Sequence, residues 1–152
     1  MQHVRRMYSE APKQLFLRAS EAPLEIDFGC HRGAFLLGMA ALHPGVNFLG
    51  IEKQIDRVEK CNARAERLGL PNARAIQGFG AESLKELPAA SVSVFHLYFP
   101  DPWPKLRHHK NRLLQADFLT SAAQHAEKGC RLYFRTDFRP YYDDAASAVV
   151  AH

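Results

Sequence analysis

The sequence has few cysteines, and their spacing excludes two classes of protein. Three occur in 152 residues: Cys30, Cys61 and Cys130. An odd number of widely separated cysteines does not form the disulfide framework of a small secreted protein, and no pair has the spacing of zinc ligands. We therefore expect reduced, buried thiols in a cytosolic protein, and no metal site.

Long hydrophobic runs are also missing. No stretch approaches the roughly 18 apolar residues that span a bilayer, and the N-terminus lacks the apolar core of a signal peptide. There is no internal repeat, low-complexity segment or linker, while 47% of the residues are apolar, enough for a sizeable core. The sequence predicts a single soluble, cytoplasmic domain over residues 1–152 that has no membrane partner. It leaves the oligomeric state open.

Acidic residues are slightly outnumbered. Lys and Arg total 20 against 16 for Asp and Glu, which gives a formal net charge of +4. This excess suits a polyanionic partner such as a nucleic acid but does not require one.

Short apolar runs alternate with segments of helical periodicity. The predicted strands are 23–28, 46–51, 73–78, 92–99 and 131–136. The predicted helices are 34–43, 54–68, 81–87, 116–127 and 141–150. This alternation predicts a doubly wound α/β fold, in which a mainly parallel sheet carries helices on both faces.

The loop after the first predicted strand, DFGCHRG, does not have the G-x-G-x-x-G pattern of a dinucleotide site. Gly29 and Gly33 allow a tight turn, and Asp27 suits a cationic ammonium or sulfonium better than a pyrophosphate. Glu52, at the end of the second strand, is placed to accept both hydroxyls of an adenosine ribose. The set favours S-adenosylmethionine over NAD. The alternative is an ordinary turn with solvated acids.

The segment FPDPWPKLRHHKNR, from Phe99 to Arg112, combines an acidic, proline-stiffened turn with a basic cluster. At the ligand end of a sheet, its cations Lys105, Arg107, Lys110 and Arg112 are expected to contact phosphates. Taken alone, such a cluster is more often a solvated face. Trp103 is expected to pack the loop, with base stacking as the alternative.

Four segments resemble the bacterial tRNA (guanine-N7)-methyltransferase family. They are EIDFGCHRGAFLLGMA, NFLGIEKQIDRVEKCNARAERLGLPNARAIQ, YFPDPWPKLRHHKNRLLQADFL and YFRTDF, in this order between Leu24 and Phe138. The resemblance implies transfer of a methyl group from S-adenosylmethionine to N7 of a guanine in the variable loop of tRNA. It also implies that Asp137 binds substrate, with helix capping as the alternative role.

The expected chemistry assigns a role to Asp101. Guanine N7 has a free lone pair at neutral pH, so methyl transfer needs positioning and electrostatics rather than a general base. Asp101 can accept from the N1–H and N2–H donors of guanine, and its charge offsets that of the methylated, cationic ring. Lys105 and Arg107 then hold the RNA backbone.

The sequence departs from the family pattern in several places. His31 stands where the family usually has glycine and is expected to crowd the methionine part of the cofactor. After the third strand, Phe79 or Gly80 stands where the family has an acidic residue, and Glu82 lies slightly beyond. Phe79 can pack on adenine, while Arg139 replaces an acid in the last motif. The sequence ends at His152, before the family's last two strands, so the fifth strand is expected to have an open edge.

These departures favour one alternative, a noncatalytic RNA-binding module, which the intact acids Asp27, Glu52 and Asp101 oppose. A second alternative is a methyltransferase for a small metabolite, and the basic segment counts against it.

Overall fold

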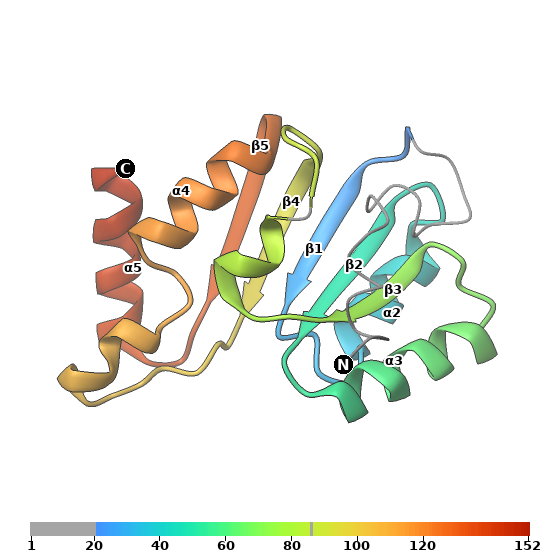
Figure 1. Cartoon of the computed structure of the whole chain (residues 1–152), viewed down its shortest axis with the longest axis horizontal. Coiled ribbons are helices and arrows are strands. Elements are labelled where there is room, and N and C mark those ends of the chain that lie inside the picture. The colour runs from blue at the N-terminus through green and yellow to red at the C-terminus, as the bar shows by residue number, and fades with distance from the viewer. Residues whose placement is uncertain (1–20, 86) are drawn as a thin grey trace.

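The computed structural model describes residues 21–85 and 87–152 and contains a five-stranded sheet of order β3-β2-β1-β4-β5 (Figure 1). The strands are β1 Leu24–Phe28, β2 Asn47–Glu52, β3 Ala73–Gln77, β4 Val92–Tyr98 and β5 Ala126–Arg135. All neighbouring pairs are parallel. The helical elements are α2 Ala34–Leu42, α3 Ile55–Arg67, η2 Gly80–Leu84, η3 Leu106–Asn111, α4 Ala116–His125 and α5 Arg139–Ala151. The predicted doubly wound fold is confirmed.

The two faces of the sheet bury separate apolar clusters. Adjacent residues of β2 divide between them, since Phe48 packs with α2 and α3 whereas Leu49 packs in the cluster that contains η2, α4 and α5. Successive side chains of a strand point to opposite faces, so these helical layers lie on opposite sides of the sheet. Cys30 and Cys61 are buried, Cys130 is partly buried, and none forms a disulfide.

Two predicted elements differ from the structure. The predicted helix 81–87 is a short 3₁₀ turn, because its amides bond to carbonyls three residues earlier and Pro88 follows closely. β5 begins at Ala126 rather than 131, because Val92 already pairs with Ala126. The register then shifts, with extra residues in β5, so that Val94 pairs with Arg131.

Within the described part of the chain, β5 pairs with β4 alone and so has the open edge that was expected. Over the same residues, no helix is both long and apolar enough to cross a membrane.

Gly33 connects the loop after β1 to the packing between α2 and α3. It caps α2 with a φ of 75°, a conformation that costs other residues about 1–2 kcal/mol. A Cβ atom at this position would lie 2.4 Å from Cys61 Sγ and 3.2 Å from Leu37 Cγ. Gly33 therefore allows both the turn and the close approach of α3.

We expect Gly33→Ala to lower the free energy of unfolding by about 2–4 kcal/mol, because backbone strain adds to overpacking. Gly69→Ala is the matched control, since Gly69 has a φ of 63° but open space where a Cβ atom would lie. Urea unfolding should show a smaller loss for Gly69→Ala, and Cys61→Ala should partly rescue Gly33→Ala. Equal losses in the two glycine variants would contradict the packing argument.

Candidate functional site

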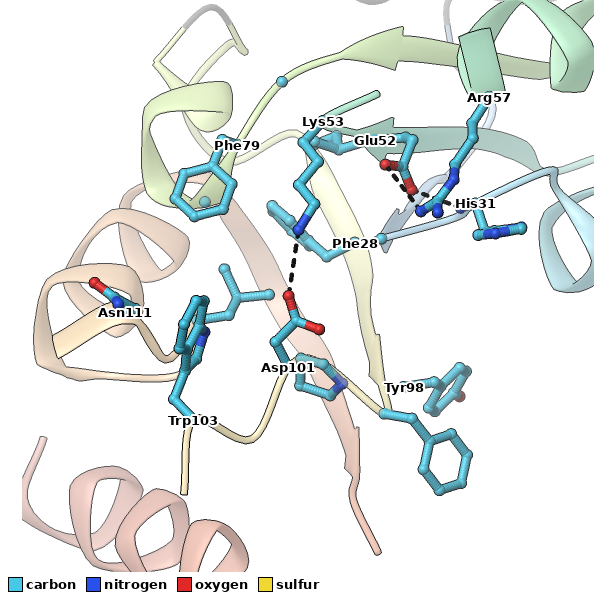
Figure 2. Close-up of a pocket in the computed structure, with 17 residues that line it drawn as sticks. Phe28, His31, Glu52, Lys53, Arg57, Phe79, Tyr98, Asp101, Trp103 and Asn111 are labelled. Carbon is cyan, nitrogen blue, oxygen red and sulfur yellow. Dashed lines mark hydrogen bonds and ion pairs between the residues drawn. The ribbon is translucent and has the colours of Figure 1, made fainter. Parts of the chain in front are cut away.

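The carboxyl ends of four parallel strands surround a cavity of about 320 Å³ (Figure 2). Its walls come from the segments that follow β1, β2, β3 and β4. Four predicted site residues line it: Gly29, Glu52, Phe79 and Asp101. The crevice beyond the carboxyl ends of the strands is the usual ligand site of such sheets.

Glu52 is a buried carboxylate at the end of β2, with 4% of its surface exposed. Its two oxygens each accept one backbone N–H at 3.0 Å, from His31 and from Gln54. The guanidinium of Arg57 lies 3.7 Å from the same carboxylate. A carboxylate oxygen has more than one acceptor site, so Glu52 keeps capacity for the hydroxyls of a ribose.

Gly29 and His31 shape the loop that bonds to Glu52. Gly29 has a φ of 76°, and its N–H donates to Ile51 O at 2.7 Å. His31 also has left-handed backbone geometry, with a φ of 53°. Figure 2 shows its ring beside Glu52 and Arg57 at the edge of the cavity. The predicted crowding of a cofactor by His31 stays a prediction.

Asp27 lies on β1, just before this loop, and is not among the residues that line the cavity. Only 6% of its surface is exposed, and burial raises the pKa of its carboxyl group to about 7. A cationic group nearby would favour the ionised form. Asp27 and Glu52 thus provide acidic groups at the ends of adjacent strands.

Phe79 follows β3 and presents its ring to the cavity with 66% of its surface exposed. Gly78 and Gly80 flank it on the same wall. Glu82, the next acidic residue, is not on this wall and instead forms a 2.8 Å ion pair with Lys85. Among the residues that the structure describes, the wall that follows β3 therefore presents a flat apolar ring and no acid, where the family pattern has an acidic residue.

These residues fit S-adenosylmethionine. Glu52 has acceptor capacity for ribose hydroxyls, the exposed ring of Phe79 suits an adenine, and the buried acid Asp27 suits a cation. Among the described residues, no group of three or more His, Cys, Asp or Glu side chains is arranged to hold a metal ion.

Asp101 stands across the cavity from Glu52, on the loop after β4. Its Oδ2 lies 3.3 Å from Lys53 Nζ, and both side chains are largely solvent-accessible. Trp103 lines the same wall and meets the His108 ring edge-on at 5.8 Å. Its ring is half-buried, so it packs the loop and also borders the cavity.

Arg112 has a different role from the one predicted. Its side chain is 2% exposed, so the predicted contact with phosphate is wrong. It donates to Pro102 O at 2.8 Å and to Trp103 O at 3.5 Å, and it forms an ion pair with Asp144. Its guanidinium also lies 4.8 Å from the centre of the Tyr141 ring. Arg112 therefore fastens the Pro102–Trp103 turn to α5.

The other predicted substrate residues lie outside the cavity. Lys105 precedes η3 and Arg107 lies within it, and both are exposed. Asp137 is exposed between β5 and α5. Its alternative role as a cap is not observed, since Phe138 is the N-cap and no side chain caps that helix. Gly33 also lies outside the cavity lining, at the N-terminus of α2.

Lys53 and Arg57 line the cavity, although the sequence had not indicated either. Lys53 directly follows Glu52 in the sequence, and this adjacency could have indicated a residue that lines the cavity. Arg57 lies within the first turns of α3, where an isolated arginine looks like an ordinary surface residue.

Comparisons with known proteins give a consistent result. The family model described as "Putative methyltransferase" matches residues 21–152. The tRNA (guanine-N(7)-)-methyltransferase of Sodalis glossinidius is 41% identical over 128 residues, which cover 84% of this chain and 53% of the relative. The enzyme of the same name from Streptomyces coelicolor is 39% identical over 140 residues, covering 91% and 51%. The chain thus spans about half the length of these curated relatives.

Solved structures share the fold at low sequence identity. The antibiotic-resistance methyltransferase Kmr has a TM-score of 0.58 and 23% identity, with 86% of this chain and 75% of Kmr covered. Coclaurine N-methyltransferase has a TM-score of 0.59 and 13% identity, with 74% and 30% covered. These similarities show a Rossmann-like methyltransferase fold.

We expect Arg112→Ala to lower the free energy of unfolding by about 2 kcal/mol, because it removes a buried hydrogen-bonding cation while leaving Asp144 accessible to water. Arg139→Ala is the matched control, since Arg139 pairs with Asp143 at 2.8 Å on α5 but is 82% exposed. Chemical denaturation should place Arg139→Ala within about 0.5 kcal/mol of wild type. Similar small losses in both variants would contradict the anchoring role.

Proposed function

Since the chain belongs to the methyltransferase family whose model matches residues 21–152, we propose that it transfers a methyl group from S-adenosylmethionine to N7 of a guanine in the variable loop of tRNA. The observation that carries this proposal is the juxtaposition of Glu52 and Asp101 in one cavity. The first suits the nucleoside of the cofactor, and the second suits the donor edge of guanine.

Residues at the carboxyl ends of β1, β2 and β3 would hold the cofactor. Glu52 would accept its ribose hydroxyls, Phe79 would pack on its adenine, and Asp27 would offset the charge of its methionine end. When bound, S-adenosylmethionine supplies a methyl group carried by a sulfonium. The backbone at Gly29 would approach it closely, because no side chain intervenes there.

The acceptor needs no proton removed, since N7 of guanine has a lone pair. Asp101 would accept from guanine N1–H and N2–H and so turn N7, on another edge, toward the methyl group. As the methyl moves to N7, the ring gains a positive charge, which the carboxylate stabilises. The exposed Lys105 and Arg107 would contact phosphates, and Asp137 would provide a further polar contact to the substrate.

The decisive experiment is a calorimetric titration with S-adenosylmethionine, followed by methyl transfer to unmodified tRNA and N7-specific cleavage of the product. Cleavage at one variable-loop guanine supports the proposal. Cofactor binding without methyl transfer would favour the noncatalytic RNA-binding module. The absence of both cofactor binding and methyl transfer would overturn the enzyme assignment.

Glu52→Ala is expected to weaken S-adenosylmethionine binding by about 1–3 kcal/mol, the cost of losing a buried hydrogen-bond partner. The residue also orders two backbone segments, so Glu52→Gln, which keeps the shape, should be measured beside it. Glu82→Ala is the control, because that exposed acid lies off the cavity wall. Calorimetric affinities that match wild type in both Glu52 variants would refute the ribose assignment.

Asp101→Asn and the variants Lys105→Ala and Arg107→Ala should affect different quantities. Asp101→Asn keeps the shape but removes the charge, so the single-turnover rate at saturating tRNA and cofactor should fall about tenfold with most tRNA affinity retained.

The two cation variants should weaken tRNA binding and reduce its salt dependence by roughly one unit per lost phosphate contact. An Asp101→Asn rate equal to wild type would show that Asp101 neither orients guanine nor stabilises its charge.

A further inference from the structure

Lys53 brings a cation to the carboxylate proposed to hold the substrate base. It follows Glu52 at the end of β2, and its Nζ lies 3.3 Å from Asp101 Oδ2 on the loop after β4. Figure 2 shows the extended Lys53 side chain reaching Asp101, with Phe79 and Trp103 on the same side of the pair. The ion pair therefore joins the two strand ends proposed to bind cofactor and substrate.

Fold stability does not account for this pair. The Lys53 and Asp101 side chains are 50% and 67% exposed, and ion pairs so exposed contribute about 0–1 kcal/mol. Lys60 and Asp56 form a pair of similar length, 3.4 Å, on the surface of α3. The pair of Lys53 differs because both members line the cavity.

The arrangement places a hydrogen-bond donor beside an acceptor. Guanine presents the complementary pattern, with N2–H and N1–H donors followed by the O6 acceptor. Adenine has an amino donor in place of O6, which would face the Lys53 donor. Its N1 is an unprotonated acceptor, which would face the Asp101 carboxylate. An Asp101 carboxylate on N1–H and N2–H leaves O6 on the side where a neighbouring ammonium can donate.

We propose that Lys53 is a specificity-determining residue, which donates a hydrogen bond to O6 of the target guanine while Asp101 accepts from its N1–H and N2–H. This inference rests on the proposed function. An ammonium has three donors, so Nζ can bond to O6 and keep its contact with Asp101. That contact also holds Nζ away from N7, whose lone pair must stay free.

Lys53 selects the base and does not accelerate the transfer. Its positive charge opposes the charge that develops on the ring, whereas the charge of Asp101 offsets it. The contribution of Lys53 is therefore expected in kcat/KM and in binding, and not in the single-turnover rate at saturation.

The test combines protein and RNA changes in one cycle. Wild type, Lys53→Met and Lys60→Met are each given tRNA with guanine or 2-aminopurine at the target position, and kcat/KM and equilibrium binding are measured. 2-Aminopurine lacks both O6 and N1–H. Asp101 is present in all three proteins, so the loss of its hydrogen bond from N1–H affects all three alike. We expect the preference for guanine to fall about tenfold in Lys53→Met, the effect of one charge-assisted hydrogen bond. Lys60→Met should keep the wild-type preference.

Each outcome decides a different point. An unchanged preference in Lys53→Met would overturn the inference, and so would an equal loss on both RNAs, which would mean that Lys53 only positions Asp101. Lys53→Arg should retain part of the preference, because it restores a donor. If wild type methylates neither RNA, the proposed function fails. In that case, a preference for guanine in equilibrium binding that depends on Lys53 would still support base recognition by Lys53. If equilibrium binding also shows no such preference, the inference about Lys53 fails as well.

Discussion

The buried carboxylate of Glu52 is the interaction on which the rest of the site depends. Its oxygens accept the backbone N–H groups of His31 and Gln54, so one side chain fixes the loop after β1 and the start of α3. Burying a carboxylate is costly unless hydrogen-bond donors and a counter-charge surround it. The two amides are the donors, and Arg57 supplies the positive charge. A negative charge at the first turn of α3 is also favoured by the helix dipole. The same carboxylate thus organises the cavity wall and faces its interior.

The loop on the opposite wall depends on a buried cation instead. Phe99 and Trp103 have φ angles of 50° and 45°, a conformation that costs about 1–2 kcal/mol per residue. The hydrogen bonds from Arg112 to the carbonyls of Pro102 and Trp103 offset this strain by tying the turn to α5. One basic segment therefore contains cations of two kinds, an anchor in the interior and exposed residues available to a polyanion.

The alternation of apolar runs was sufficient to predict the parallel sheet and its helices, because period and length carry that information directly. The acid at the end of β2 was predictable for the same reason, since strand ends determine where ligands bind. The burial of Arg112 was not, because it depends on contacts with α5, where its partner Asp144 is 32 positions away in the sequence. Nor was the contact between Lys53 and Asp101 predictable, since the two residues are 48 positions apart in the sequence and only the fold brings them together.

The electrostatics of Asp27 bear on the class of ligand that this sheet can bind. Burial holds the pKa of its carboxyl group near 7, so close to neutral pH a small change in local potential decides whether it carries a charge. An approaching phosphate would raise that pKa further and would meet the negative charge of Glu52 on the next strand. An ammonium or sulfonium would lower the pKa of Asp27 and so convert a partly neutral acid into a carboxylate partner. With a glycine in place of Asp27 the loop after β1 would suit a pyrophosphate, whereas with Asp27 it favours a cationic group. Glu52 suits the ribose of the ligand in either case.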